Sequence, residues 1–357
     1  MLGSVGLETK LRERDIEPGA AAVVGGGALL LVLAFVSFLL NTGLSAVPLF
    51  LFVGVAAYGW VRHQAETARG LMLLATTLGV LILTLIVVFL FLEARQAFEL
   101  MGLDILLRTE APVWSVNEGV YGLAVAVHGT IVTTIIAMLI AAPLGIAGAL
   151  FISEIAPDRV GDIVKPGIEI LAGIPSIVYG FIGFAILNQY FQVKFSLANF
   201  GSLLLAGMMI GLMALPTVVS VSEDAINAIP ESMKSGSLAL GATDWQTMKG
   251  ITLPAAFSGV SAGVILGVGR AIGETMAATV ILGNIPRNFA QPLPDVFDNT
   301  ATLTSLIASQ YGVAVGRANQ LSALFAAGVL LFVIVMILSV ASQRIEARMR
   351  RKLEGEV

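Results

Sequence analysis

One arginine and one glutamate lie four residues apart in a long apolar segment, a combination that suits anion chemistry. The segment 256–284 predicts a single membrane helix, with Arg270 well inside it and Glu274 one helical turn later. A charge at such a depth costs about 2.5–3.5 kcal/mol and normally faces the bundle interior or a water-filled path. Side chains at i and i+4 share a helix face and can pair. One interpretation is therefore a structural ion pair that fixes helix register.

The other interpretation is a path for an oxyanion. An oxyanion that crosses a bilayer needs a cation in place of its hydration shell, and the planar fork of arginine matches its oxygens bidentately. A nearby carboxylate neutralises the arginine while no anion is bound, so the site does not become a permanent trap. We expect Arg270, Glu274 and the adjacent Thr275 to line such a path.

A second interruption lies in the apolar segment 167–188. Gly173 and Pro175 are expected to break its helix, and broken helices often line substrate paths in transporters. Ser176 and Tyr179 would then face the path, although a plain kink explains the proline equally well.

Three glycines repeat every fourth residue in the helix that carries the arginine. Gly259, Gly263 and Gly267 form the small-xxx-small pattern that lets membrane helices approach closely. Ordinary bundle packing is the favoured interpretation, and a sliding interface between transporter halves is the alternative.

The composition requires a membrane environment for these residues. The chain has 357 residues, of which 57% are hydrophobic and 12% charged, whereas soluble domains carry about 25% charged residues. A soluble enzyme, a disordered chain and a nucleic-acid binder are excluded. The sequence has no cysteine, which excludes disulfides, Fe–S clusters and thiol catalysis, and only two histidines, so we expect no metal site.

The apolar runs predict an all-α fold, a polytopic transmembrane helical bundle of about eight spans, two of them N-terminal to a six-helix core. With both ends inside, fourteen Lys and Arg residues lie in inner segments and five in outer ones, as cytoplasmic loops require. The predicted spans are 21–40, 44–61, 71–93, 121–152, 167–188, 201–221, 256–284 and 322–343.

Four parts of the chain follow from these spans. They are an N-terminal cytoplasmic segment with an additional transmembrane hairpin (1–62), a first core helix with its outer loop (63–120), the main membrane domain with the cytoplasmic loop (121–343) and a basic cytoplasmic tail (344–357).

The cytoplasmic loop 223–254 is predicted to form two short helices with a sharp bend. Pro230 suits a first helical turn, and Gly241 occupies the C′ position where glycine ends a helix. Thr243 and Gln246 form a capping box for the second helix. We expect the loop to present apolar side chains at the inner membrane face, or to pack simply on the bundle.

Gly241, nine further residues and Ile251-Thr252-Leu253-Pro254 resemble half of the EAA loop of ABC importer permeases. In that family the loop docks on the ATP-hydrolysing subunit and couples hydrolysis to bundle movement. Ser235-Gly236-Ser237 stands where the family has Glu-Ala-Ala. The resemblance assigns coupling roles to Leu238, Leu240, Gly241, Ala242, Thr243, Trp245, Ile251, Leu253 and Pro254.

Longer stretches narrow the resemblance to the phosphate-specific (Pst) permeases. These are 129–154, 171–184 (LAGIPSIVYGFIGF) and 238–277, which includes GRAIGET, and further stretches favour the PstC type over the PstA type. No Walker loop GxxxxGK[ST] occurs in the chain, so it is expected to lack an ATPase site and to hold no cofactor, with ATP and Mg bound by a partner.

The resemblance implies a transmembrane subunit of a phosphate ABC importer in the cytoplasmic membrane. Its implied partners are a second permease subunit, ATP-binding subunits and an extracytoplasmic phosphate-binding protein, which the outer loop 285–321 would receive. Two alternatives remain: the same architecture serving sulfate or molybdate, and a self-sufficient ion-coupled carrier or channel, which would need no docking loop.

Overall fold

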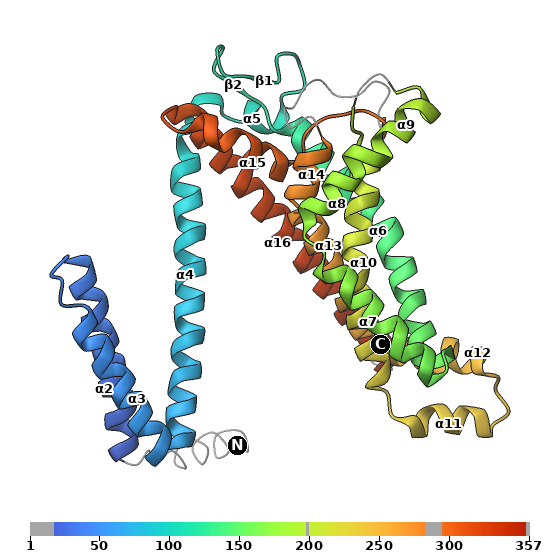
Figure 1. Ribbon diagram of the computed structural model, residues 1–357, viewed down its shortest axis with the longest axis horizontal. Coiled ribbons are helices and arrows are strands. Elements are labelled where there is room, and N and C mark those ends of the chain that lie inside the picture. The colour runs from blue at the N-terminus through green and yellow to red at the C-terminus, as the bar shows by residue number, and fades with distance from the viewer. Residues whose placement is uncertain (1–17, 198–199, 283–294, 355–357) are drawn as a thin grey trace, which may run out of the picture. The chain divides into compact units, whose positions relative to one another are not determined.

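The computed structural model describes residues 18–197, 200–282 and 295–354. The predicted cytoplasmic segment before residue 18, part of the outer loop and the end of the basic tail lie outside these ranges. The chain divides into two compact units, Met1–Val88 and Phe89–Val357. Figure 1 labels the helices of both units.

The first unit contains a helical hairpin and the beginning of a long helix. Helices α2 (Pro18–Leu39) and α3 (Ala46–Arg62) pack together, and α4 runs from Gln64 to Met101. Asn41 and Gly43 make the turn between α2 and α3 with positive φ angles of 51° and 72°. The sequence between the helices therefore places turn-forming residues where the chain reverses.

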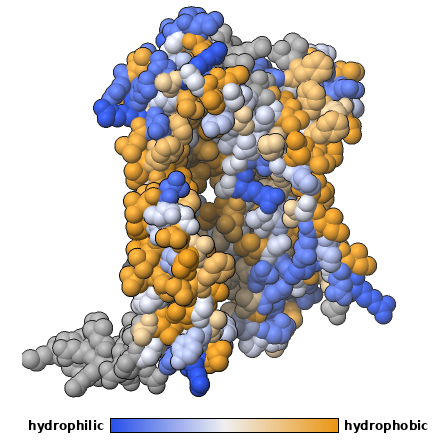
Figure 2. Space-filling model, turned by 60° about the vertical axis from the view of Figure 1, so that its left-hand side comes forward, coloured by the Kyte–Doolittle hydropathy of each residue, from blue (hydrophilic) through white to orange (hydrophobic). Residues whose placement is uncertain are grey.

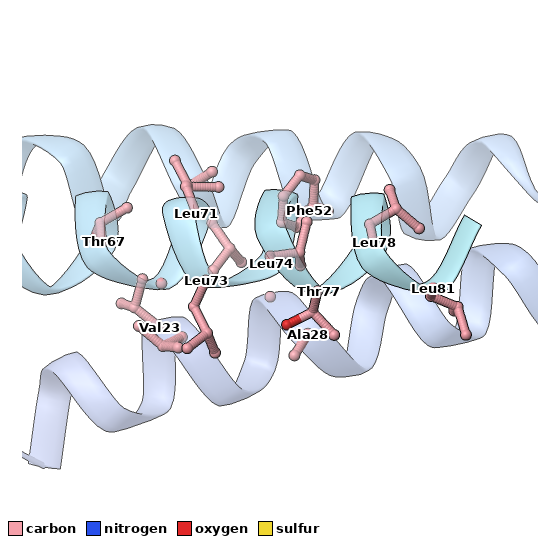
Figure 3. A pocket seen from close by; sticks show the side chains of 15 residues that line it. Val23, Ala28, Phe52, Thr67, Leu71, Leu73, Leu74, Thr77, Leu78 and Leu81 are labelled. Atoms are coloured by element: carbon pink, nitrogen blue, oxygen red, sulfur yellow. The ribbon is translucent and has the colours of Figure 1, made fainter. Parts of the chain in front are cut away.

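An apolar cavity of about 310 Å³ lies among α2, α3 and the first turns of α4. Val23, Phe52 and Leu74 are among the side chains around it in Figure 3. Thr67 and Thr77 are its only hydroxyl-bearing lining residues, and the lining has no charged side chain. This cavity therefore offers no site for a hydrated or charged solute.

Deletion of residues 1–62 is expected to leave the second unit folded. The main buried apolar clusters of the second unit draw on residues after Leu90 in the described parts of the chain, so the deletion removes no side chain from them. The truncated chain should still accumulate in the membrane as a folded bundle, at the level of the untruncated chain. A truncated chain that no longer accumulates as a folded bundle would contradict this expectation.

In its described residues, the second unit is a bundle of helices with one small β-hairpin. Its first elements are α5 (Asp104–Leu107), β1 (Trp114–Ser115), β2 (Val120–Tyr121), α6 (Ala124–Leu150), α7 (Asp158–Gly173), α8 (Ser176–Ile182), α9 (Asn188–Phe195) and α10 (Leu203–Asn227). Then follow α11 (Glu231–Ala239), α12 (Asp244–Thr247), α13 (Leu253–Gly273), α14 (Met276–Ile281), α15 (Leu303–Ala314) and α16 (Ala318–Glu354). The strands pair antiparallel, with Trp114 opposite Tyr121. Three π-helical turns, Phe151–Ile155, Gly183–Leu187 and Met248–Thr252, extend α6, α8 and α12.

Helix α10 is the centre of this bundle and packs against both α6 and α13 (Figure 1). Glycines on both sides of the contact with α6 make the approach close. A Cβ atom added at Gly211 would lie 2.8 Å from the carbonyl oxygen of Ala137, and one at Gly145 would lie 2.6 Å from Val218. Since real Cβ atoms do not come this close to their neighbours, larger residues there would force the helices apart.

The predicted fold class is confirmed. Within the described ranges, six helices are long and apolar enough to cross a membrane, or up to seven if the bent pair Arg159–Gly173 and Ser176–Phe195 forms one span. Large apolar side chains cover the outer faces of the helices, as a lipid-facing protein requires, and Figure 2 shows these apolar surfaces in orange.

Three of the eight predicted spans differ from the expectation. The segment 44–61 lies in α3, which has only 17 residues. The segment 167–188 bends by 88° between α7 and α8, because the residue before Pro175 is driven to an extended conformation. The segment 256–284 is interrupted after Gly273, where Glu274 is extended, and resumes as α14.

Candidate functional site

The candidate path lies where two interrupted helices of the second unit pack together. One interruption separates α7 from α8 and the other separates α13 from α14. A Cβ atom at Gly180 of α8 would lie 2.9 Å from the Cα of Ala277 in α14, and one at Gly183 would lie 2.9 Å from Ile281. The close approach of α8 and α14 places both interruptions in one region, an arrangement that occurs at substrate sites of membrane transporters.

Arg270 lies in the last turn of α13, beside the second interruption, and its side chain is exposed. Its Nη1 donates a long hydrogen bond of 3.5 Å to Thr217 Oγ1 on α10. The C-terminal end of a helix favours a cation because the last carbonyl groups carry partial negative charge. Among the described residues no carboxylate forms an ion pair with this guanidinium.

Glu274 does not pair with Arg270, so the prediction that the two share a helix face is wrong. The helix ends at Gly273, and Glu274 adopts an extended conformation with ψ of 119°. Its Oε1 accepts a hydrogen bond of 3.1 Å from the backbone N–H of Ala277. The carboxylate therefore satisfies a free N–H at the start of α14, while the arginine lies at the end of α13.

Two threonines surround this interruption. Thr275 Oγ1 donates a hydrogen bond of 3.1 Å to the carbonyl oxygen of Gly273. Thr304 of α15 donates one of 2.8 Å to the carbonyl oxygen of Glu274. These hydroxyl groups satisfy carbonyl groups that the broken helix leaves free, as a helix interruption inside a membrane needs.

The first interruption is closed by Tyr179. Only 7% of Tyr179 is exposed, and its hydroxyl donates a hydrogen bond of 3.0 Å to the carbonyl oxygen of Leu171 in α7. This hydrogen bond joins α7 to α8, and the expectation that the side chain faces the path stays a prediction. Pro175 lies just before α8, and Ser176, the first residue of α8, is half-buried.

The glycine stripe of α13 faces α10. A Cβ atom at Gly259 would lie 2.3 Å from the Cβ of Ala225, one at Gly263 would lie 3.1 Å from Ser222 Oγ, and one at Gly267 would lie 2.7 Å from Val218. The helix that carries Arg270 therefore packs on α10 through close backbone approach along its length.

The cytoplasmic loop has the predicted local structure. Helix α11 ends at Ala239, and Gly241 follows with a φ angle of +87°, a left-handed conformation that glycine adopts without strain. Thr243 and Gln246 form the capping box of α12. The bend between α11 and α12 thus results from local sequence signals.

The predicted coupling residues fall into two groups. Leu238, Leu240 and Trp245 are 43%, 91% and 66% exposed. Gly241 and Thr243 are also exposed, whereas Ala242, Ile251, Leu253 and Pro254 are half-buried. The bend therefore presents large apolar side chains outward, which is how docking surfaces differ from ordinary soluble loops.

Two ion pairs join the same end of the bundle. Lys234 Nζ of α11 lies 2.6 Å from Glu154 Oε1 in the π-helical turn after α6. Lys165 Nζ of α7 lies 2.7 Å from Glu223 Oε2 of α10, and the Glu223 side chain is only 6% exposed. The first pair connects the loop to the end of α6, and the second pair connects α7 to α10.

Comparison with known proteins decides the family. The family model described as "Binding-protein-dependent transport system inner membrane component" matches residues 141–351. The chain belongs to this family of ABC importer permeases. The matched range of the permease includes the loop with Gly241, both helix interruptions and Arg270.

Individual relatives agree with this assignment. The permease is 36% identical over 278 residues to the probable ABC transporter permease protein YqgH of Bacillus subtilis, covering 76% of this chain and 88% of the relative. It is 34% identical over 277 residues to the phosphate transport system permease protein PstC of Xylella fastidiosa, covering 72% and 83%. It is 31% identical over 311 residues to PstC of Haemophilus influenzae, covering 82% of this chain and 95% of the relative. The resemblance to PstC-type permeases is confirmed.

Solved structures share the fold. The permease aligns with a chain of a bacterial alginate ABC transporter in complex with an alginate-bound periplasmic protein, with a TM-score of 0.55, 17% identity and coverage of 80% of this chain and 97% of that one. A second structure of a bacterial ABC transporter that imports alginate gives a TM-score of 0.54 and 16% identity, covering 80% and 99%. At this identity the likeness concerns the fold alone.

Membership defines the general role of the chain. It is a multi-pass inner-membrane subunit of an ABC importer, it works with ATPase subunits and a binding protein, and its family has neither an ATPase site nor a cofactor of its own. This excludes the alternative of a self-sufficient carrier or channel.

The sequence did not predict three side-chain contacts of this permease. Each is a contact between side chains that are distant in the sequence. They are the hydrogen bond of Arg270 to Thr217, the Lys234–Glu154 ion pair and the Lys165–Glu223 ion pair. Thr217 follows Pro216 within α10, and a polar residue next to a proline inside a membrane helix is a usable signal. The lysine–glutamate pairs have no comparable local pattern.

Proposed function

We propose that this permease is the PstC-type subunit of an ABC importer for inorganic phosphate, with Arg270 on the substrate path. The observation that carries the proposal is the state of Arg270, an exposed arginine at a helix interruption that makes a long hydrogen bond to Thr217 and no ion pair with a described carboxylate. Its guanidinium thus has donors available for an oxyanion. The PstC relatives support phosphate as that oxyanion.

Glu274 gives the path a preference among oxyanions. Its carboxylate is half-buried and accepts a hydrogen bond from the backbone of α14, four residues after Arg270 in the sequence. A carboxylate can only accept hydrogen bonds. Monohydrogen phosphate has a hydroxyl to donate, whereas sulfate and molybdate at neutral pH have none. The same negative charge weakens anion binding, so that phosphate can leave the site again.

Movement of the path is driven from the cytoplasmic loop. The exposed Leu238, Leu240 and Trp245 form the surface on which an ATP-binding subunit docks, and ATP and Mg are bound there rather than in this chain. The close packing of α13 on α10 through Gly259 and Gly267 carries the loop's displacement to Arg270 as a rigid-body motion, and this is the basis of alternating access.

The complete importer contains further subunits. A second permease, PstA-like, completes the path, and an extracytoplasmic phosphate-binding protein delivers the anion at the outer face. The excess of Lys and Arg in the inner segments supports a cytoplasmic location for both termini.

Anion uptake by the assembled importer tests the substrate. Vesicles that contain the complex, with ATP on the cytoplasmic side, should accumulate labelled phosphate, and an excess of unlabelled sulfate or molybdate should leave this uptake unchanged. The matched control is a complex with an ATPase subunit that cannot hydrolyse ATP. Uptake of sulfate or molybdate at rates equal to phosphate would support the alternative oxyanion permease instead.

A further inference from the structure

Helix α11 is held on the bundle by very few side chains. It has no fully buried residue, and between residues 231 and 246 only Lys234, Ser237 and Ala242 are less than exposed. Lys234 and Ser237 lie three residues apart and so share the inner face of the helix. The orientation of α11, and of the bend that follows it, therefore depends on the contacts of these two side chains.

Lys234 makes the stronger of the two contacts. Its Nζ lies 2.6 Å from Glu154 Oε1, and the two side chains are only 13% and 12% exposed. An ion pair shielded from water to this degree is lost at a higher cost than an exposed pair, because removal of one partner leaves the other charge partly buried and uncompensated. The contact spans 80 residues of sequence, so it links separate elements rather than stabilising one helix.

Ser237 makes the second contact, to the other half of the loop. Thr247 Oγ1 donates a hydrogen bond of 3.0 Å to Ser237 Oγ, and Thr247 is buried at the end of α12. Ser237 stands at the last position of the family's Glu-Ala-Ala, where an alanine has no hydroxyl. The departure from the family motif thus adds a bond between α11 and α12.

We propose that the Lys234–Glu154 ion pair is the positioning contact through which α11 moves the transmembrane helices. This inference rests on the proposed coupling role of the cytoplasmic loop. Glu154 lies in the turn between α6 and α7, and α7 is joined to α10 by the pair of Lys165 with Glu223. A displacement of α11 by an ATPase subunit therefore reaches α6, α7 and α10 through two short ionic contacts.

Charge reversal in the assembled importer tests this role. The variants are Lys234→Glu, Glu154→Lys and the two together, and the readouts are phosphate uptake and ATP hydrolysis by the same vesicles. Each single variant should lower phosphate transported per ATP by about fivefold or more, the lower range of coupling effects. The double variant, which restores opposite charges, should recover most of this loss. A merely structural role would lower the amount of complex and leave the ratio unchanged.

A matched control is the exposed pair of Arg95 and Glu99, whose side chains are 74% and 59% exposed. Its reversal should leave the ratio unchanged, since exposed pairs contribute little. Normal ratios in both single variants of the Lys234–Glu154 pair, or a double variant no better than the singles, would overturn the proposal.

If the charge-reversal variants fail to assemble, a variant with a cysteine at each of the two positions is used instead. The natural chain has no cysteine, so Lys234→Cys with Glu154→Cys introduces the only thiols of this subunit. Bridging them with a short bis-maleimide should raise the uptake-to-hydrolysis ratio of the double variant, and no change on bridging would overturn the proposal. If disruption of the Gly241 bend also leaves the ratio of uptake to hydrolysis normal, the proposed coupling role of the loop is wrong. If the ratio is normal only in the variants of the Lys234–Glu154 pair, the coupling role stands and the inference about this pair is wrong.

Discussion

Replacement of Arg270 by glutamine is expected to abolish phosphate uptake while the importer still assembles. Glutamine keeps a hydrogen-bonding side chain but removes the charge and the guanidinium fork. Each charge-assisted hydrogen bond is worth about 1.5–3 kcal/mol, and each 1.4 kcal/mol changes an equilibrium tenfold. Loss of a bidentate contact should therefore lower uptake by about a hundredfold or more. Labelled phosphate uptake at equal membrane levels of the complex measures this effect.

Assembly should survive because Arg270 contributes little to packing. It is exposed, and its hydrogen bond to Thr217 is long. Arg270→Lys, which keeps the charge without the fork, should retain part of the uptake. Arg62→Gln is a matched control, since Arg62 is also an exposed arginine but ends α3, in the N-terminal segment whose deletion is expected to leave the second unit folded. Uptake that is unchanged in Arg270→Gln would remove Arg270 from the path.

The region around Arg270 also shows where sequence reasoning stops. The apolar run 256–284 contains no proline, since Pro254 precedes it and Pro286 follows it. No proline therefore predicts that the helix ends at Gly273. The interruption is stabilised from outside the helix, by Thr304 bonding to the carbonyl oxygen of Glu274. A helix ending that depends on a distant hydroxyl cannot be inferred from periodicity, and the incorrect Arg270–Glu274 pair followed from the assumption of a continuous helix.

The cytoplasmic loop was predictable for the opposite reason. The helix end at Gly241 and the capping box of Thr243 with Gln246 depend on residues within a few positions of each other. Such signals act through the backbone that carries them, whatever the tertiary surroundings. The attachment of the loop through Lys234 and Glu154 depends on packing between distant helices, and only the structure supplies it.

Substitution of Gly241 by valine is expected to uncouple ATP hydrolysis from transport. Gly241 has a φ angle of +87° and no neighbouring atom within 4 Å of an added Cβ. The effect therefore arises from backbone strain rather than from a steric clash. A residue other than glycine in this conformation costs about 1–3 kcal/mol, and a β-branched residue is a strong outlier there. The bend should open, moving Leu238 and Trp245 relative to each other.

The measurement is the ratio of phosphate uptake to ATP hydrolysis, together with the amount of ATPase subunit that co-purifies. Gly241→Val should lower both. Gly241→Ala should have a smaller effect, because alanine tolerates a positive φ angle better than valine. Normal co-purification with normal transport in Gly241→Val would refute the requirement for this bend.

Gly236→Ala is the matched control, because it changes a glycine of the same loop to the residue that the family has there. Gly236 lies inside α11 without a positive φ angle, and an added Cβ meets nothing within 4 Å. Alanine in place of glycine should stabilise this helix by about 1 kcal/mol. Transport that is normal or higher in Gly236→Ala, and lost in Gly241→Val, would separate the need for a left-handed residue at the bend from a general sensitivity of the loop to added side chains.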